Sequence, residues 1–312
     1  MQDISGRTSF VTGGASGIGL GMAQAFVAAG MKVAIADIDE TALERAVATL
    51  RDQGGTVLGI RLDVADAASW QAAATTVETE LGAVDILCNN AGVQQGRMSF
   101  DKHLELKDVP PQLWKLLFDI NVMGVFLGMR TFAPGMIARG KGGHVVNTAS
   151  MAGFLAPPGL AVYAATKFAV VGLSESAAAE LAPHGIGLSI LCPGGVQSNL
   201  VETTAALRAK LVPASPGPAE ALLTQKLPHP PKMDPRNVGE MVLRAIRNDE
   251  LYVFTHPEYR PLVEERFATA IDAFTESAES GYADTPAMLE RSRSKIYTAQ
   301  KERRGRRRST AE

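Results

Sequence analysis

The sequence is poor in cysteine and histidine and is nearly neutral overall. Its 312 residues include two cysteines, Cys88 and Cys192, and five histidines. Each cysteine ends an apolar run and the pair forms no metal-ligand pattern, so we expect buried free thiols and no metal site. The formal net charge of −2 gives no general attraction to polyanions, which argues against a nucleic-acid partner.

Features of membrane and exported proteins are also scarce. No stretch approaches the roughly 20 uninterrupted apolar residues that a membrane span needs, and the opening MQDISGRT lacks the basic and apolar regions of a signal peptide. We therefore expect a cytoplasmic protein with no membrane partner. With 46% hydrophobic residues, the chain is long enough for one large domain with an appendage.

What the chain does have is a regular alternation of strand-like and helix-like segments. Strand-like runs include TSFVT, KVAIAD, TVLGIRLDV, VDILCNN, HVVNT, IGLSILC and LYVF, and helical patterns separate most of them. This alternation predicts an α/β fold, a Rossmann-type doubly wound parallel sheet of about seven strands with helices on both faces. We expect that domain to span residues 1–256. A helical extension over 257–300 and a disordered basic tail over 301–312 would follow it.

A glycine-rich turn, TGGASGIG, connects the first strand to the first helix. Gly13, Gly17 and Gly19 let the backbone turn tightly and approach a ligand closely, and the first amides of the helix favour an anion there. The plain alternative is a strand-to-helix connection, since the spacing differs from the G-x-G-x-x-G fingerprint.

The second strand ends at Asp37, eighteen residues after Gly19. A carboxylate at this place can accept hydrogen bonds from both hydroxyls of an adenosine ribose, and it repels a 2′-phosphate. No arginine or lysine stands next to Asp37 in the sequence or in the glycine turn, which favours NAD over NADP. The alternative for Asp37 is a helix cap, for which Asp39 is the better candidate.

The stretch SMAGFLAPPGLAVYAATK carries a hydroxyl, a phenol and an ammonium. The strand over residues 144–148 delivers Ser150 just past its carboxyl end, and the helical pattern that follows places Tyr163 and Lys167 one turn apart. A lysine cation beside a phenol lowers the tyrosine pKa, so Tyr163 could act as an acid or a base. The alternative for Ser150 is a turn or cap hydroxyl.

Asn121 lies in FDINVMGVF, within a long helix predicted from about Pro111 to Arg139. An asparagine among so many apolar neighbours needs hydrogen-bond partners if it is buried. The simpler interpretation is a buried amide whose hydrogen-bond partners lie within the protein core.

Together these motifs resemble the short-chain dehydrogenase/reductase family, in the family's order from about residue 5 to residue 198. The residues that carry the resemblance are TGGASGIG (12–19), Asp63, NNAG (89–92), Asn121, Ser150, Tyr163, Lys167 and PGGVQS (193–198).

The resemblance implies roles for particular residues. Tyr163 would be the acid/base, Ser150 would hydrogen-bond the substrate oxygen, and Lys167 would tune Tyr163 and bind the nicotinamide ribose. Asn121 would complete a proton relay through water. The residues implied to bind NAD are Gly13, Ser16, Gly17, Ile18, Gly19, Asp37, Ile38, Asp63, Val64, Asn90, Ala91, Gly92, Tyr163, Lys167, Pro193, Gly194, Val196 and Ser198. The family often has threonine where Ser198 stands, and the hydroxyl is kept.

Substrate choice is expected from three irregular stretches, at residues 93–111, 151–161 and about 195–235. Their apolar residues favour a hydrophobic or aromatic secondary alcohol or its ketone, although packing beneath a loop explains them equally well; they are Met151, Phe154, Leu155, Leu160 and Leu200. Residues 251–274, with SNL after PGGVQ, resemble a bacterial branch that includes dehydrogenases oxidising the Cα alcohol of lignin-type β-aryl ethers. His256 and Arg260 in this segment would reach a neighbouring active site or cap and salt-bridge their helix.

Two functions remain open at this point. One is an NAD-dependent oxidoreductase that interconverts a secondary alcohol and a ketone, working as a homodimer or homotetramer as the family does. The other is a non-catalytic NAD(H)-binding protein that responds to redox state. The complete set of Ser150, Tyr163 and Lys167 favours the enzyme.

Overall fold

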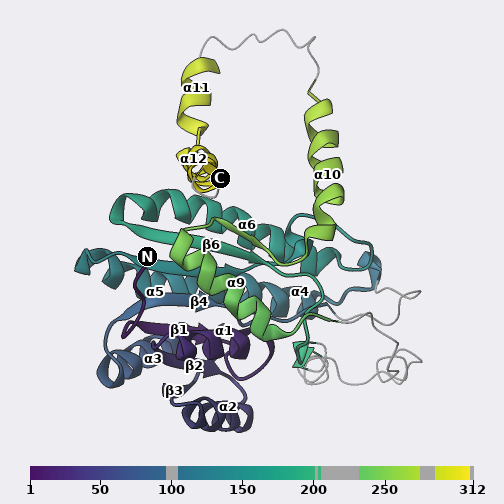
Figure 1. The fold of residues 1–312 in the computed structure, drawn as a ribbon. Coiled ribbons are helices and arrows are strands. Elements are labelled where there is room, and N and C mark those ends of the chain that lie inside the picture. Colours follow the sequence, from purple (N-terminus) through teal and green to yellow (C-terminus); the bar gives the residue numbers. More distant parts are fainter. Residues whose placement is uncertain (96–104, 201–202, 205–231, 275–284, 310–312) are drawn as a thin grey trace.

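A single parallel sheet of seven strands organises the described residues, which are 1–95, 105–200, 203–204, 232–274 and 285–309 of the computed structural model. The strand order is β3-β2-β1-β4-β5-β6-β7 (Figure 1). The strands are β1 (Thr8–Thr12), β2 (Lys32–Asp37), β3 (Thr56–Arg61), β4 (Val84–Asn89), β5 (Gly143–Thr148), β6 (Ile186–Cys192) and β7 (Tyr252–Phe254). The order reverses between β1 and β4, and this switch point is where parallel α/β sheets bind ligands.

Helices cover both faces of the sheet, as predicted. On one face lie α1 (Gly17–Ala28), α2 (Glu40–Asp52) and α9 (Pro235–Asn248), and on the other lie α3 (Ala67–Glu80), α5 (Gly124–Arg139) and α6 (Ala161–Leu181). Alternate residues of each strand serve the two cores, so Phe10 packs on one side and Val11 on the other. Both cysteines are buried free thiols. The parallel seven-stranded sheet with helices on both faces confirms the predicted Rossmann-type fold.

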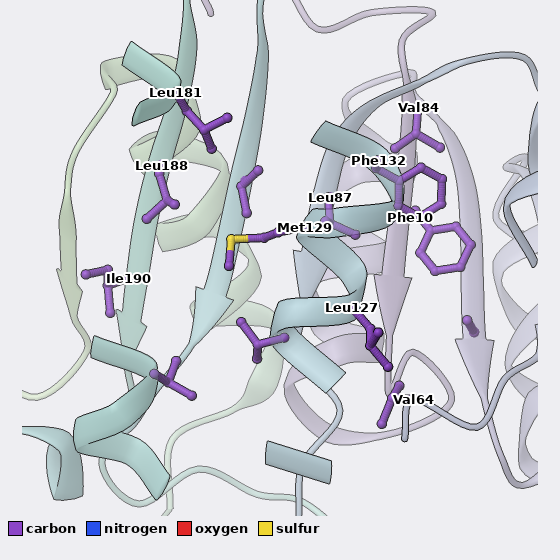
Figure 2. Packing of buried hydrophobic residues seen from close by; sticks show 14 of the residues in the cluster. Phe10, Val64, Val84, Leu87, Leu127, Met129, Phe132, Leu181, Leu188 and Ile190 are labelled. Carbon is purple, nitrogen blue, oxygen red and sulfur yellow. The ribbon is translucent and has the colours of Figure 1, made fainter. Parts of the chain in front are cut away.

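An aromatic group anchors the core beneath α3 and α5. The ring of Phe10 on β1 lies 5.0 Å from that of Phe132 and 5.9 Å from that of Trp70, measured between centroids. Figure 2 shows Phe10 and Phe132 side by side, with Val84 and Leu87 of β4 next to them. The Trp70 indole N–H donates to the carbonyl of Val64 at 3.0 Å. This packing fixes the segment after β3 against the sheet.

The long helix expected over residues 111–139 is interrupted. It consists of α4 (Pro111–Phe118), a π-helical turn (Asp119–Met123) and α5. A π turn inserts an extra residue and is common at functional sites. Here it turns Asn121 inward, where the buried amide finds partners.

The same stretch, Pro111–Arg139, is the one part of the described chain that is long and apolar enough to cross a membrane by length and composition. Half of its most apolar window is buried inside the molecule. Core helices of soluble proteins meet the same criteria.

The C-terminal part differs from its prediction at the tail. After β7 come α10 (Arg260–Asp272), which extends away from the sheet, and then α11 (Thr285–Ser292) and α12 (Lys295–Ser309) (Figure 1). Residues 301–309, expected to be disordered, thus belong to a helix. The reason is tertiary: Gln300 and Arg303 donate to the carbonyl of Asp249 at 2.9 and 3.1 Å, and Arg303 also pairs with the Asp249 carboxylate.

Candidate active site

Ser150, Tyr163 and Lys167 converge at the carboxyl edge of β5, as predicted. Ser150 follows β5 and caps the short 3₁₀ turn Met151–Gly153, because its Oγ accepts the N–H of Ala152 at 3.1 Å. The same hydroxyl lies close enough to the Tyr163 phenol to act on its pKa, in the lowering direction. The turn-hydroxyl interpretation of Ser150 is therefore correct. The site role stays a prediction that is compatible with it, since accepting from an amide leaves the hydroxyl proton free to donate.

Tyr163 and Lys167 lie one turn apart on α6, with the lysine Nζ 5.6 Å from the centre of the tyrosine ring. Lys167 is buried and donates to the carbonyl of Thr148 at 3.0 Å. Burial lowers the pKa of Lys167 to about 8. Lysine, phenol and serine hydroxyl thus lie close together at the end of β5.

The expected depression of the tyrosine pKa is wrong for this structure. Burial raises the pKa of Tyr163 above its ordinary value, and the Ser150 hydroxyl opposes that rise only in part. Removal of water disfavours the phenolate more than the neighbouring groups favour it. Tyr163 is therefore a phenol near neutral pH, which is the form that can donate a proton.

Both polar atoms of the Asn121 side chain have partners inside the protein. Its Oδ1 accepts the N–H of Val93 at 2.8 Å, and its Nδ2 donates to the carbonyl of Val93 at 2.8 Å and to Thr166 Oγ1 at 3.1 Å. The simpler interpretation, a buried amide with partners in the core, is correct for this side chain. Asn121 fixes the loop after NNAG through these bonds, and its part in a water relay stays a prediction.

The glycine turn fits close approach by a ligand. Gly13 and Gly17 have φ of +62° and +50°, which strains other residues. A Cβ on Gly17 would lie 2.8 Å from Cβ of Ser198, and one on Gly13 would lie 3.0 Å from Cα of Ala91. Since Ser16 makes no side-chain cap at the N-terminus of α1, the first amides of that helix are available to an anion.

Asp37 lies at the end of β2 and supports the glycine turn. Its two carboxylate oxygens accept the N–H groups of Ala15 and Asp39, each at 3.2 Å. Burial raises the pKa of Asp37, and each oxygen keeps a lone pair for a ribose hydroxyl. Asp39 caps α2 by accepting the N–H of Ala42 at 2.9 Å, as expected.

One cation near Asp37 is invisible in the local sequence. Arg61 of β3 aligns with Asp37 across the parallel pair of strands. Its guanidinium forms an ion pair with Glu40 at 3.3 Å. Sheet pairing, not closeness in sequence, brings an arginine next to Asp37.

Asn90 joins the ends of three strands. Its Nδ2 donates to the carbonyl of Thr12 at 3.0 Å, its N–H donates to the Thr12 hydroxyl at 2.9 Å, and its Oδ1 accepts from Thr148 at 3.3 Å. The Ala91 N–H also donates to the Thr12 hydroxyl, at 3.0 Å. Asn90 and Ala91 therefore lie at the switch point.

Other predicted cofactor residues lie near the carboxyl ends of β2, β3 and β4. Asp63 accepts the N–H of Ala65 at 2.9 Å, and Val64 packs against the π turn, because a Cβ on Gly124 would lie 3.1 Å from its side chain. Ile38 is 46% exposed beside Asp37. A Cβ on Gly92 would lie 3.2 Å from Asn121 Oδ1 and 3.6 Å from the Lys167 Nζ, so Gly92 lies beside both side chains.

The PGGVQS loop is fastened at several points. The carbonyl of Pro193 accepts the N–H of Met151 at 3.0 Å, and Val196 forms a parallel bridge with Met233. The Gly194 N–H lies 3.3 Å from both Thr255 Oγ1 and His256 Nδ1. His256 thus holds this loop in place. The sequence alone suggests instead that it reaches a neighbouring active site or caps its helix.

Part of the predicted substrate pocket is structural packing. Phe154 stacks edge-on against Tyr252 and Phe254, with ring centroids 5.7 and 5.1 Å apart. Arg260 pairs with Glu264 at 2.6 Å, as the salt-bridge reading expected. Residues 96–104 and 205–231, which belong to the predicted specificity stretches, lie outside the described residues.

Two polar side chains near the site belong to no motif, and nothing in the sequence singles them out. Gln95 and Thr204 are both buried. Gln95 contacts the backbone of α6 and Thr204 contacts the loop after NNAG. Among the described residues no cluster of three or more histidine, cysteine, aspartate or glutamate side chains could hold a metal.

Comparison with known proteins assigns the chain to a family. The model of the short chain dehydrogenase family matches residues 7–208, so this protein belongs to that family. The Cα-dehydrogenase of Sphingobium sp. (strain NBRC 103272 / SYK-6) is 34% identical over 280 residues, which cover 88% of each chain. The expected resemblance to the branch of Cα-dehydrogenases is thereby confirmed.

Two solved structures are similar over nearly their whole length. The short-chain dehydrogenase/reductase of Burkholderia phymatum in complex with NAD has a TM-score of 0.77 and 33% identity, covering 90% of this chain and 100% of that chain. LigO of Sphingobium sp. strain SYK-6, solved in the apo form, has a TM-score of 0.74 and 36% identity, covering 93% and 97%. The protein is an oxidoreductase of a family that binds nicotinamide cofactors.

Proposed function

We propose that the protein is an NAD-preferring alcohol dehydrogenase/ketoreductase, in which Tyr163 is the acid/base and the substrate is a hydrophobic or aromatic secondary alcohol or its ketone. One observation carries the proposal. The Ser150 hydroxyl, the Tyr163 phenol and the Lys167 ammonium gather at the carboxyl end of β5, in a fold whose first helix has no side-chain cap at its N-terminus. A protein that only binds a nucleotide has no physical need for this set.

The proton chemistry follows from these three side chains. A bound nicotinamide supplies the hydride acceptor or donor. Ser150, with its proton free to donate, stabilises the substrate oxygen as charge develops on it. Tyr163 gives its proton to that oxygen in reduction and takes one from the alcohol in oxidation. Lys167, in contact with Thr148, keeps a cation close to the phenol in either direction.

The cofactor preference rests on Asp37. Its carboxylate lies where an adenosine ribose binds in this fold, and it repels a 2′-phosphate. Arg61, the cation in register with Asp37, is engaged by Glu40. The Glu40 carboxylate competes with a phosphate for Arg61 and adds a second negative charge near Asp37, which supports NAD.

The substrate class rests on the similarity to a Cα-dehydrogenase and on the apolar residues beside Ser150. Met151 and Leu160 flank the catalytic stretch and are buried. An aryl carbinol suits such surroundings.

The test is NADH formation from a panel of aryl and aliphatic secondary alcohols, with NAD and NADP run in parallel. Mildly alkaline pH is chosen because the raised pKa of Tyr163 holds the base form back at neutral pH. We expect turnover of aryl carbinols with NAD. Bound NADH without turnover of any alcohol or ketone in the panel would favour the non-catalytic alternative.

A further inference from the structure

The loop after NNAG caps the catalytic helix. Gln95 is fully buried, and its Oε1 accepts the N–H of Val162 at 2.9 Å and that of Tyr163 at 3.3 Å. The first N–H groups of an α-helix have no partner within the helix, and the residue at the N-cap position, Leu160, supplies no side-chain cap. A glutamine 68 residues before Tyr163 therefore provides what the local sequence of α6 lacks.

This loop is itself held from two sides. Asn121 binds both the N–H and the carbonyl of Val93. On the other side, the Gln94 N–H donates to the hydroxyl of Thr204 at 3.1 Å, and that hydroxyl donates to the carbonyl of Leu200 at 2.7 Å. A hydrogen-bonded path thus runs from the segment after PGGVQS, through the loop, to the backbone of Tyr163.

We propose that Gln95 is a positioning residue for the reaction, which caps α6 so that the Tyr163 phenol stays against Ser150 and Lys167, and that Thr204 holds the loop that presents it. The inference rests on the proposed acid/base role of Tyr163. Tyr163 lies in the first turn of α6, where a helix frays most easily. Displacement of a reacting group by about 1 Å can cost roughly 100-fold in rate.

Gln95→Leu tests the cap, because leucine fills similar space without an acceptor. We expect kcat to fall about 10- to 100-fold, while KM and the Kd for NADH stay within about twofold. Amide hydrogen exchange at Val162 and Tyr163 should accelerate, since Gln95 is their acceptor. The matched control is Gln300→Leu, which removes a glutamine–backbone hydrogen bond far from the site and should leave kcat unchanged.

Substitution of Thr204 tests the same proposal, because Thr204 binds the loop that presents Gln95. These variants also provide the test if Gln95→Leu fails to fold. Thr204→Val should lower kcat and accelerate exchange at the same two amides, and Thr204→Ser should restore both. An unchanged kcat, an equal loss of NADH affinity, or unchanged exchange at these amides would overturn the proposal. A wild-type protein without turnover would instead contradict the proposed function, and the exchange measurement separates the two failures because it needs no turnover.

Discussion

Single side chains around the candidate site differ in how far the protein itself uses their hydrogen-bonding atoms. Asp37 receives two backbone N–H groups and still has lone pairs for a ribose. Asn121 and Asn90, expected at the site for direct roles, spend their side chains on the loops around it. At this scale the sequence predicts which residues lie near the ends of the strands, but not the hydrogen bonds that their side chains make within the protein.

Asp37→Ala should narrow the preference for NAD over NADP. Loss of the carboxylate removes both the ribose acceptor and the repulsion of a 2′-phosphate, so the ratio of kcat/KM values should fall at least about tenfold, or ~1.4 kcal/mol. The matched control is Asp39→Ala, which removes the α2 cap at a cost of about 1 kcal/mol in stability and should leave the ratio alone. An equal ratio in wild type and Asp37→Ala would contradict the assignment of Asp37.

Among the elements, the π turn between α4 and α5 fixes the position of the loop after NNAG, because Asn121 in this turn binds Val93. The hydrophobic pattern of residues 111–139 predicts an unbroken helix, and it gives no sign of the extra residue. The one indication in the sequence is that an asparagine among apolar neighbours needs hydrogen-bond partners if it is buried. The turn aims Asn121 at Val93 and so links the long helix to the loop that carries Gln95.

Asn121→Ala should be strongly destabilising for this reason. Truncation leaves the N–H and carbonyl of buried Val93 without acceptor and donor, each worth about 1–3 kcal/mol. We expect a loss of roughly 2–4 kcal/mol in the free energy of unfolding, measured by urea denaturation. Asn237→Ala, on the exposed side of α9, is the matched control and should stay within about 0.5 kcal/mol. Equal losses for the two variants would show that the Val93 bonds contribute little.

Over the whole molecule, the sequence predicts the sheet well and the long-range contacts poorly. Alternating strands and helices dictate the fold because parallel strands need crossovers. Gln94 and Gln95, in contrast, are identical neighbours in sequence, and only the assembled sheet places one of them at the start of α6. The same applies to Arg61 beside Asp37 and to Arg303, whose contact with Asp249 makes a helix of a tail that composition alone marks as disordered.

The central claim is that Tyr163 transfers the proton, and its most direct test is the single-turnover rate of hydride transfer in Tyr163→Phe. The matched control is Tyr297→Phe, because Tyr297 and Lys301 repeat the four-residue spacing, while the Tyr297 hydroxyl bonds Glu175 at 3.0 Å outside the site. We predict a loss of about 10²- to 10⁴-fold for Tyr163→Phe with NADH binding retained, and a wild-type rate for Tyr297→Phe. A near-wild-type rate in Tyr163→Phe would contradict the account.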